Sequence, residues 1–189
     1  MYRAALAAVA VITASSAAAN DFAPAMSAYL ESEIRNWAQS QVLVDAIAAQ
    51  NARTASYDQA RIDTLDLAWR DEVGSSETPT VTPVMENAAA DFLRSRVDVS
   101  GGQITEVFIM DAQGLNVAAS ALTSDMWQGD EAKFTKTFSA GPDAVHFSEV
   151  ELDDSTQRYQ GQISLTITDP ATGAPIGAMT VGVDAEALM

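Results

Sequence analysis

The sequence predicts an α+β fold in which a long N-terminal helix packs on an antiparallel sheet of five strands. Apolar residues recur at helical spacing in the first half of the chain. After Gly101 and Gly102 the pattern changes to short runs rich in Val, Ile, Phe and Thr, which turn residues separate. Because most of these runs are joined by hairpin-length connections, neighbouring strands are expected to run antiparallel.

Residues 1–19 have the layout of a secretory signal peptide. A basic residue, Arg3, precedes an apolar run from Ala4 to Thr13, and small residues lead up to Ala19. The run is shorter than the roughly 20 residues that a membrane-spanning helix needs. We therefore expect cleavage after Ala19, a periplasmic or secreted protein that does not insert into the membrane, and a single domain over residues 20–189.

Three helices are expected before the sheet begins. The first is one long amphipathic helix from Pro24 to Asn51, in which no Gly or Pro interrupts the pattern. Its apolar positions recur at steps of three and four or their multiples: Met26, Leu30, Ile34, Trp37, Val44 and Ile47. The second helix runs through Tyr57 and Trp69, and the third covers Glu86 to Arg94.

The second half of the chain supplies the strands and one insert. The predicted strands are Ile104 to Met110, Leu115 to Ser120, Ala144 to Val150, Arg158 to Thr168 and Ile176 to Val183. In the longest strand, apolar residues alternate with small polar residues, so one face should be apolar and the other polar. Between the second and third strands lies an insert, Ala121 to Pro142, with a short helix through Lys133 and Phe134.

Composition excludes several kinds of function. With 10 Lys and Arg against 26 Asp and Glu, the formal net charge is −16, so nucleic acid is not an expected partner. The chain has no cysteine and a single histidine, His146. Disulfides, thiolate chemistry and multi-histidine zinc sites are thereby excluded, and neither a cofactor nor a metal site is predicted.

Besides the long helix, three segments carry a family resemblance: Val107 to Ser120, Thr123 to Lys133, and parts of the stretch from Gln162 to Ala178. They resemble the single Cache sensor modules, extracytoplasmic relatives of PAS domains that are also called PDC domains. The resemblance covers roughly residues 22–188 and implies a PAS-like sheet with a small molecule bound between sheet and insert. It also implies that the flanking helix passes occupancy to a signalling region. The sequence contains no kinase or methyl-accepting region, so we expect a separate partner, such as a membrane sensor protein.

The insert supplies the first candidate ligand-binding residues. The indole of Trp127 can form one wall of a pocket and stack on a cation or a planar group. Asp125 and Asp130 on either side can hold an ammonium group by charge-assisted hydrogen bonds. The alternatives are that Trp127 plugs the end of the sheet and that either aspartate caps the short helix.

Further candidates lie on the short helix and on the longest strand. Lys133 can hold a carboxylate of a ligand, or it can pair with Glu131 or Asp130. The remaining candidates lie on or beside the polar face of the longest strand: Tyr159, Gln162 and Ser164. The resemblance and these residues together imply a small-molecule-binding sensor module.

The expected ligand is a small polar metabolite: an amine, a quaternary ammonium compound, an amino acid or a carboxylate. One alternative is an interaction subunit that forms a homodimer through its long helix. Another is a hydrolase that uses two carboxylates as acid and base. The sequence lacks the G-x-S-x-G, Walker A, G-x-G-x-x-G and H-E-x-x-H motifs, so enzymatic activity is not predicted.

Overall fold

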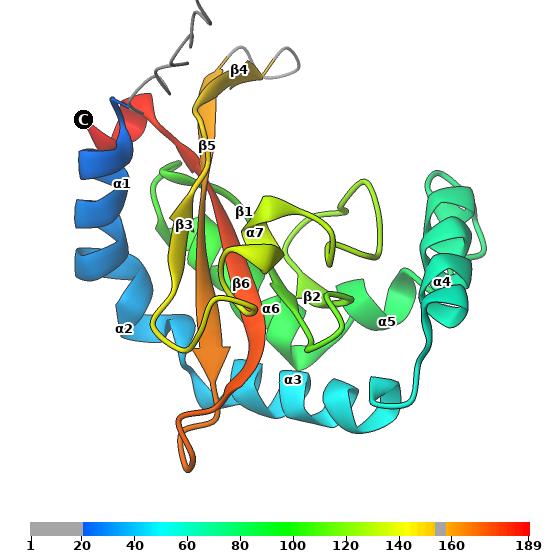
Figure 1. Ribbon diagram of the computed structural model, residues 1–189. Coiled ribbons are helices and arrows are strands. Elements are labelled where there is room, and N and C mark those ends of the chain that lie inside the picture. Colours follow the sequence, from blue (N-terminus) through cyan, green and yellow to red (C-terminus); the bar gives the residue numbers. More distant parts are fainter. Residues whose placement is uncertain (1–20, 154–157) are drawn as a thin grey trace, which may run out of the picture.

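The computed structural model describes residues 21–153 and 158–189 (Figure 1), so the predicted signal peptide lies outside the described residues. The helical elements are α1 (Ala23–Tyr29), η1 (Leu30–Ile34), α2 (Arg35–Ala38), α3 (Gln41–Thr54), α4 (Gln59–Glu72), α5 (Thr82–Met85), α6 (Ala88–Val99), α7 (Ala132–Thr135) and η2 (Glu186–Leu188). The strands are β1 (Ile104–Met110), β2 (Asn116–Ala119), β3 (Val145–Phe147), β4 (Glu151–Asp153), β5 (Arg158–Thr168) and β6 (Pro175–Asp184). None of the helices in the described ranges is long and apolar enough to cross a membrane.

The predicted α+β fold with an antiparallel sheet is confirmed. The strand order is β2-β1-β6-β5-β3, and β4 pairs with the beginning of β5. The sheet has six strands and not the five expected, because the predicted strand from Ala144 to Val150 is shortened to β3 and the additional strand β4 follows it. At Ser148 the side-chain oxygen, and not a backbone carbonyl, accepts the hydrogen bond from the Gln162 amide at 2.8 Å. The regular ladder is interrupted there, and pairing resumes at Glu151.

The predicted single long helix is wrong, because the chain bends at Gln39 and Ser40. α1 and α2 follow one side of the sheet, and α3 then runs across its end (Figure 1). Ser40 has extended backbone angles (φ −60°, ψ 140°) and stands at the N-cap of α3, a position that serine favours. The side chain of Gln39 bonds to the backbone of Thr166 and Thr168 in β5. The bend therefore coincides with an attachment of the helices to the sheet.

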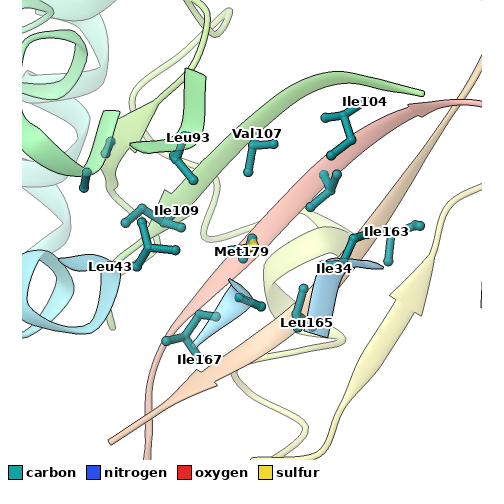
Figure 2. Packing of buried hydrophobic residues seen from close by; sticks show 14 of the residues in the cluster. Ile34, Leu43, Leu93, Ile104, Val107, Ile109, Ile163, Leu165, Ile167 and Met179 are labelled. Atoms are coloured by element: carbon teal, nitrogen blue, oxygen red, sulfur yellow. The ribbon is translucent and has the colours of Figure 1, made fainter. Parts of the chain in front are cut away.

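The core lies between these helices and one face of the sheet. Figure 2 shows Val107 and Ile109 of β1 gathered with Met179 of β6 and with Leu43 and Leu93 of the helices. The alternation predicted for β5 is confirmed, because its apolar residues belong to this core: Ile163, Leu165 and Ile167. The stripe expected to support a homodimer is buried in the same core: Met26, Leu30, Ile34, Val44 and Ile47.

A fully buried carboxylate, Asp111, joins α3 to the turn between β1 and β2. Its Oδ2 atom accepts hydrogen bonds from Thr54 Oγ1 at 2.8 Å and Gln50 Nε2 at 3.1 Å. Its Oδ1 atom accepts from the backbone amides of Gln113 at 2.9 Å and Leu115 at 3.0 Å. Asp111 therefore holds the turn and anchors the helix at the same time.

We predict that Asp111→Ala lowers the free energy of unfolding by about 3 kcal/mol, because buried donors on both elements lose their acceptor. Urea denaturation of the mature protein measures this change. The matched control Asp63→Ala removes an exposed carboxylate that accepts from Gln59 on the same helix, and it should change stability little. Equal stability of the two variants would contradict the anchoring role of Asp111.

Candidate functional site

The second face of the sheet is partly covered by the insert. Phe134 of α7 and Phe138, whose rings stack at 5.1 Å, pack with Phe108 and Met110 of β1. On the other strands this face carries small residues, including Ala178 of β6. The insert therefore forms a cover over the middle of the sheet, and the open space lies at one end of it.

A polar hollow of about 650 Å³ lies beside this cover. We call it the sheet-side hollow. It is bordered by α7 and by β1, β3, β4, β5 and β6, and its charged or polar lining includes Glu106, Lys133, Lys136, His146, Gln160 and Gln162. Its lining also includes Glu131, Glu149 and Glu151, so two lysines meet four glutamates here. Such a lining suits a ligand with charges of both signs.

Strand register produces the centre of this hollow. Glu106 of β1 and Gln162 of β5 are both paired with Gly182 of β6, so the three residues form a row across the sheet. A Cβ atom on Gly182 would lie 2.7 Å from the Glu106 Cγ atom. Because Gly182 has no side chain, Glu106 and Gln162 can form a hydrogen bond over it.

Burial raises the pKa of the Glu106 carboxyl above its ordinary value, since it disfavours the charged form. The positive charge of Lys133 and the hydrogen bond with Gln162 oppose this rise. Burial and the charge of Lys136 lower the pKa of His146 at the same hollow. An acid with a raised pKa and an imidazole with a lowered pKa therefore face the space beneath the insert.

Lys133 is held in place by three contacts. Its Nζ atom lies 2.9 Å from Glu131 Oε2 and donates to Gln128 Oε1 at 3.0 Å. The same atom lies 5.4 Å from the centre of the Phe108 ring, in cation–π geometry. The alternative that Lys133 pairs with Glu131 is confirmed, and the lysine still borders the sheet-side hollow.

Trp127, Asp125 and Asp130 line a different, smaller hollow of about 380 Å³, between the insert and α4. We call it the α4-side hollow. The indole Nε1 of Trp127 donates to the Gln113 carbonyl at 2.8 Å, and the ring lies against Gly129. Trp127 thus closes the end of the β1–β2 turn and presents its remaining surface to this hollow.

The aspartates of the α4-side hollow are already engaged in part. Asp66 of α4 accepts from the backbone amides of Met126 at 3.0 Å and Trp127 at 3.1 Å, and it pairs with Arg70 at 2.6 Å. Asp125 accepts from the side chain of Gln128 and lies 3.9 Å from Arg70. These contacts fasten the insert to α4.

Asp130 does not cap α7, because Glu131 occupies the N-cap position and makes no side-chain capping bond.

The remaining predicted residues lie outside both hollows. Ser164 is buried and shares a 3.1 Å hydrogen bond with Thr180 across the sheet, and Tyr159 is exposed near the end of β5.

Sequence reasoning missed Glu106 as a site residue. The available signal was that it is the one charged residue in an otherwise apolar or neutral strand. Sequence reasoning also gave His146 no place in a pocket. In the described part of the chain, no group of three or more His, Cys, Asp and Glu residues is arranged to hold a metal ion.

Comparison with known proteins yields structural neighbours only. No family model and no curated protein matches the sequence. The sensor domain of the histidine kinase DctB from V. cholerae is similar with a TM-score of 0.45 and 14% identity, over 88% of this chain and 55% of that one. The ligand-binding domain of the Campylobacter jejuni chemoreceptor Tlp3 with 4-methylisoleucine has a TM-score of 0.41 and 14% identity, over 87% and 62%.

A third neighbour is the ligand-binding domain of the amino acid chemoreceptor PctC from Pseudomonas aeruginosa in complex with GABA. Its TM-score is 0.38 at 12% identity, over 82% of this chain and 62% of that one. This chain therefore spans less than two thirds of the length of each of the three. All three are named as sensor or ligand-binding domains.

We predict that the Glu106→Gln variant becomes more stable than the wild type as the pH rises from 4.5, the ordinary pKa of the group. The folded state binds the Glu106 proton more tightly than the unfolded state, so the wild type loses stability as the pH rises through the raised pKa. Denaturant unfolding of both proteins across this range gives the difference. Parallel stability curves for the two proteins would show that Glu106 is not buried as described.

Proposed function

We propose that this protein is a binding module for a small metabolite that carries both an ammonium and a carboxylate group, such as an amino acid. The observation that carries the proposal is the row of Glu106, Gly182 and Gln162 at the floor of the sheet-side hollow, with Lys133 above it. The volume of about 650 Å³ lies within the usual range for small-molecule sites, roughly 300–1,000 Å³.

The charges in the hollow give a ligand a defined orientation. Glu106 is partly shielded from water, so an ammonium group that reaches it gains a strong charge-assisted hydrogen bond. At the outer edge, Lys136 forms no ion pair with a carboxylate in the described residues. The ligand carboxylate would lie toward Lys136 and His146, which lines the same hollow.

Ligand occupancy would reach a separate partner protein through the end of β6. Two residues after Gly182, Asp184 pairs with Arg158 at 3.0 Å and accepts hydrogen bonds from the first amides of η2. η2 contacts α1, the first helix of the mature chain. A ligand that binds one arrangement of this segment better than another shifts the population toward it.

The same proposal places the protein in the periplasm or outside the cell, as the signal-peptide pattern of residues 1–19 indicates. It assigns the protein no catalytic role. The α4-side hollow, with Trp127 and Asp125, is the competing position for the ligand, and the experiment below separates the two.

We predict that a thermal-shift screen of the mature protein against amino acids, amines, betaines and dicarboxylates finds amino acids among the compounds that raise the midpoint. A ligand that binds only the folded state raises the midpoint by mass action. Glu106→Gln and Gly182→Ala should each weaken the affinity of such a compound about tenfold or more, since one removes the charge and the other fills the floor.

Trp127→Ala and Asp125→Asn provide the matched comparison at the α4-side hollow. Both variants should retain the wild-type affinity for the compound found in the screen. Loss of binding in these two variants, with wild-type affinity in Glu106→Gln and Gly182→Ala, would show that the ligand binds in the α4-side hollow. The absence of any stabilising compound would count against a binding function for either hollow.

A further inference from the structure

A hollow of about 920 Å³ shares no lining residue with either of these two sites. We call it the helix-side groove. It is bordered by α3, α4, α5 and α6, which Figure 1 labels, and by β2. Apolar side chains make up most of its lining, among them Val42, Ala46, Ala49, Leu65, Val84 and Met126.

Apart from the arginines, polar side chains in the groove are already bonded to the protein, and its carboxylate Asp45 accepts a hydrogen bond from Gln41. Gln50 and Thr54 donate to Asp111, and Asn87 donates to the carbonyls of Pro83, Val84 and Val117. The floor therefore offers few free hydrogen-bonding groups to a bound molecule. Whatever fills it must be apolar, because a polar group placed there would lose water without gaining a partner.

Two cations stand at the edge of this apolar floor. Arg53 of α3 and Arg61 of α4 are exposed, and neither forms an ion pair with a carboxylate in residues 21–153 or 158–189. Arg61 lies 5.7 Å from the centre of the Tyr57 ring, which holds its guanidinium beside the groove. Two of the 10 basic residues of a strongly acidic chain thus border the same hollow.

We propose that the helix-side groove binds an amphipathic carboxylate, with its aliphatic chain on the apolar floor and its carboxylate between Arg53 and Arg61. Arginine binds carboxylates with two parallel hydrogen bonds, which favours this head group over a neutral one. The proposal is independent of the sheet-side hollow. The groove and that hollow share no lining residue.

The probes are decanoate, 1-decanol and acetate, each titrated calorimetrically into the mature protein below the concentration at which micelles form. Decanoate should bind with one site per chain. 1-Decanol should bind about tenfold or more weakly, because it lacks the charge, and acetate should not bind measurably, because it lacks the chain.

Two kinds of variant test the two halves of the site. The double variant Arg53→Gln with Arg61→Gln should weaken decanoate about tenfold or more and leave 1-decanol unchanged. Ala49→Phe fills the groove from an exposed helical position and should abolish the binding of both. The matched control Arg35→Gln removes an exposed arginine that pairs with Glu31, and it should bind decanoate like the wild type.

The proposal is overturned if decanoate does not bind, if 1-decanol binds as tightly, or if the double variant and Arg35→Gln behave alike. It is likewise overturned if the protein sediments with phosphatidylcholine vesicles while decanoate has no effect, since the groove would then contact a lipid surface. Binding of decanoate that Glu106→Gln also abolishes would place this ligand in the sheet-side hollow. Unchanged decanoate binding by Glu106→Gln, together with loss in Ala49→Phe, supports the groove.

Discussion

The arrangement of the whole molecule depends on one buried carboxylate. Asp111 satisfies side-chain donors of α3 and backbone donors of the β1–β2 turn at once, with no exposure to water. Asn51 strengthens the same junction by bonding to the carbonyl of Ile176 at 2.7 Å and to the amide of Ala112 at 2.8 Å. An unpaired buried carboxylate is costly, so these elements hold only one arrangement. The helices are thereby fixed to one face of the sheet, and the other face is left to the insert.

The two faces of the sheet consequently have different physical roles. The face toward the helices is packed with apolar side chains, and it supplies most of the favourable burial. The face toward the insert is packed by a cluster that includes Met126, Phe134 and Phe138, and away from this cluster the small residue Gly182 leaves room above β6. A partly buried charge, Glu106, is tolerated at this position because Lys133 and Gln162 compensate it. An ammonium group of a bound ligand would compensate the charge of Glu106 more strongly than Lys133 and Gln162 do.

Much of the fold was predictable from sequence, because local patterns determine it. β1 and β5 were predicted with the bounds observed, since β1 ends in an apolar run, β5 alternates between apolar and polar residues, and turn residues flank both. The bend at Ser40 was missed because it coincides with a contact to β5 that is distant in sequence. The strand β4 pairs with the nearby β5, and it was missed because its three residues are too few to show a pattern. The residues of the candidate site were likewise predictable only in part. Lys133 and Gln162 were predicted and border the sheet-side hollow, whereas the place of Glu106 in it depends on the register that aligns it with Gly182.

The central claim is that a ligand binds over Gly182 and not beside Trp127. An NMR titration of the 15N-labelled mature protein with the strongest amino acid ligand tests it directly, because backbone and indole amides report on each hollow separately. The account predicts saturable shifts of the Gly182 and Gln162 amides and of α7, with the Trp127 indole resonance unchanged. Shifts confined to the Trp127 indole and to α4, with the resonances of β6 unchanged, would contradict this account.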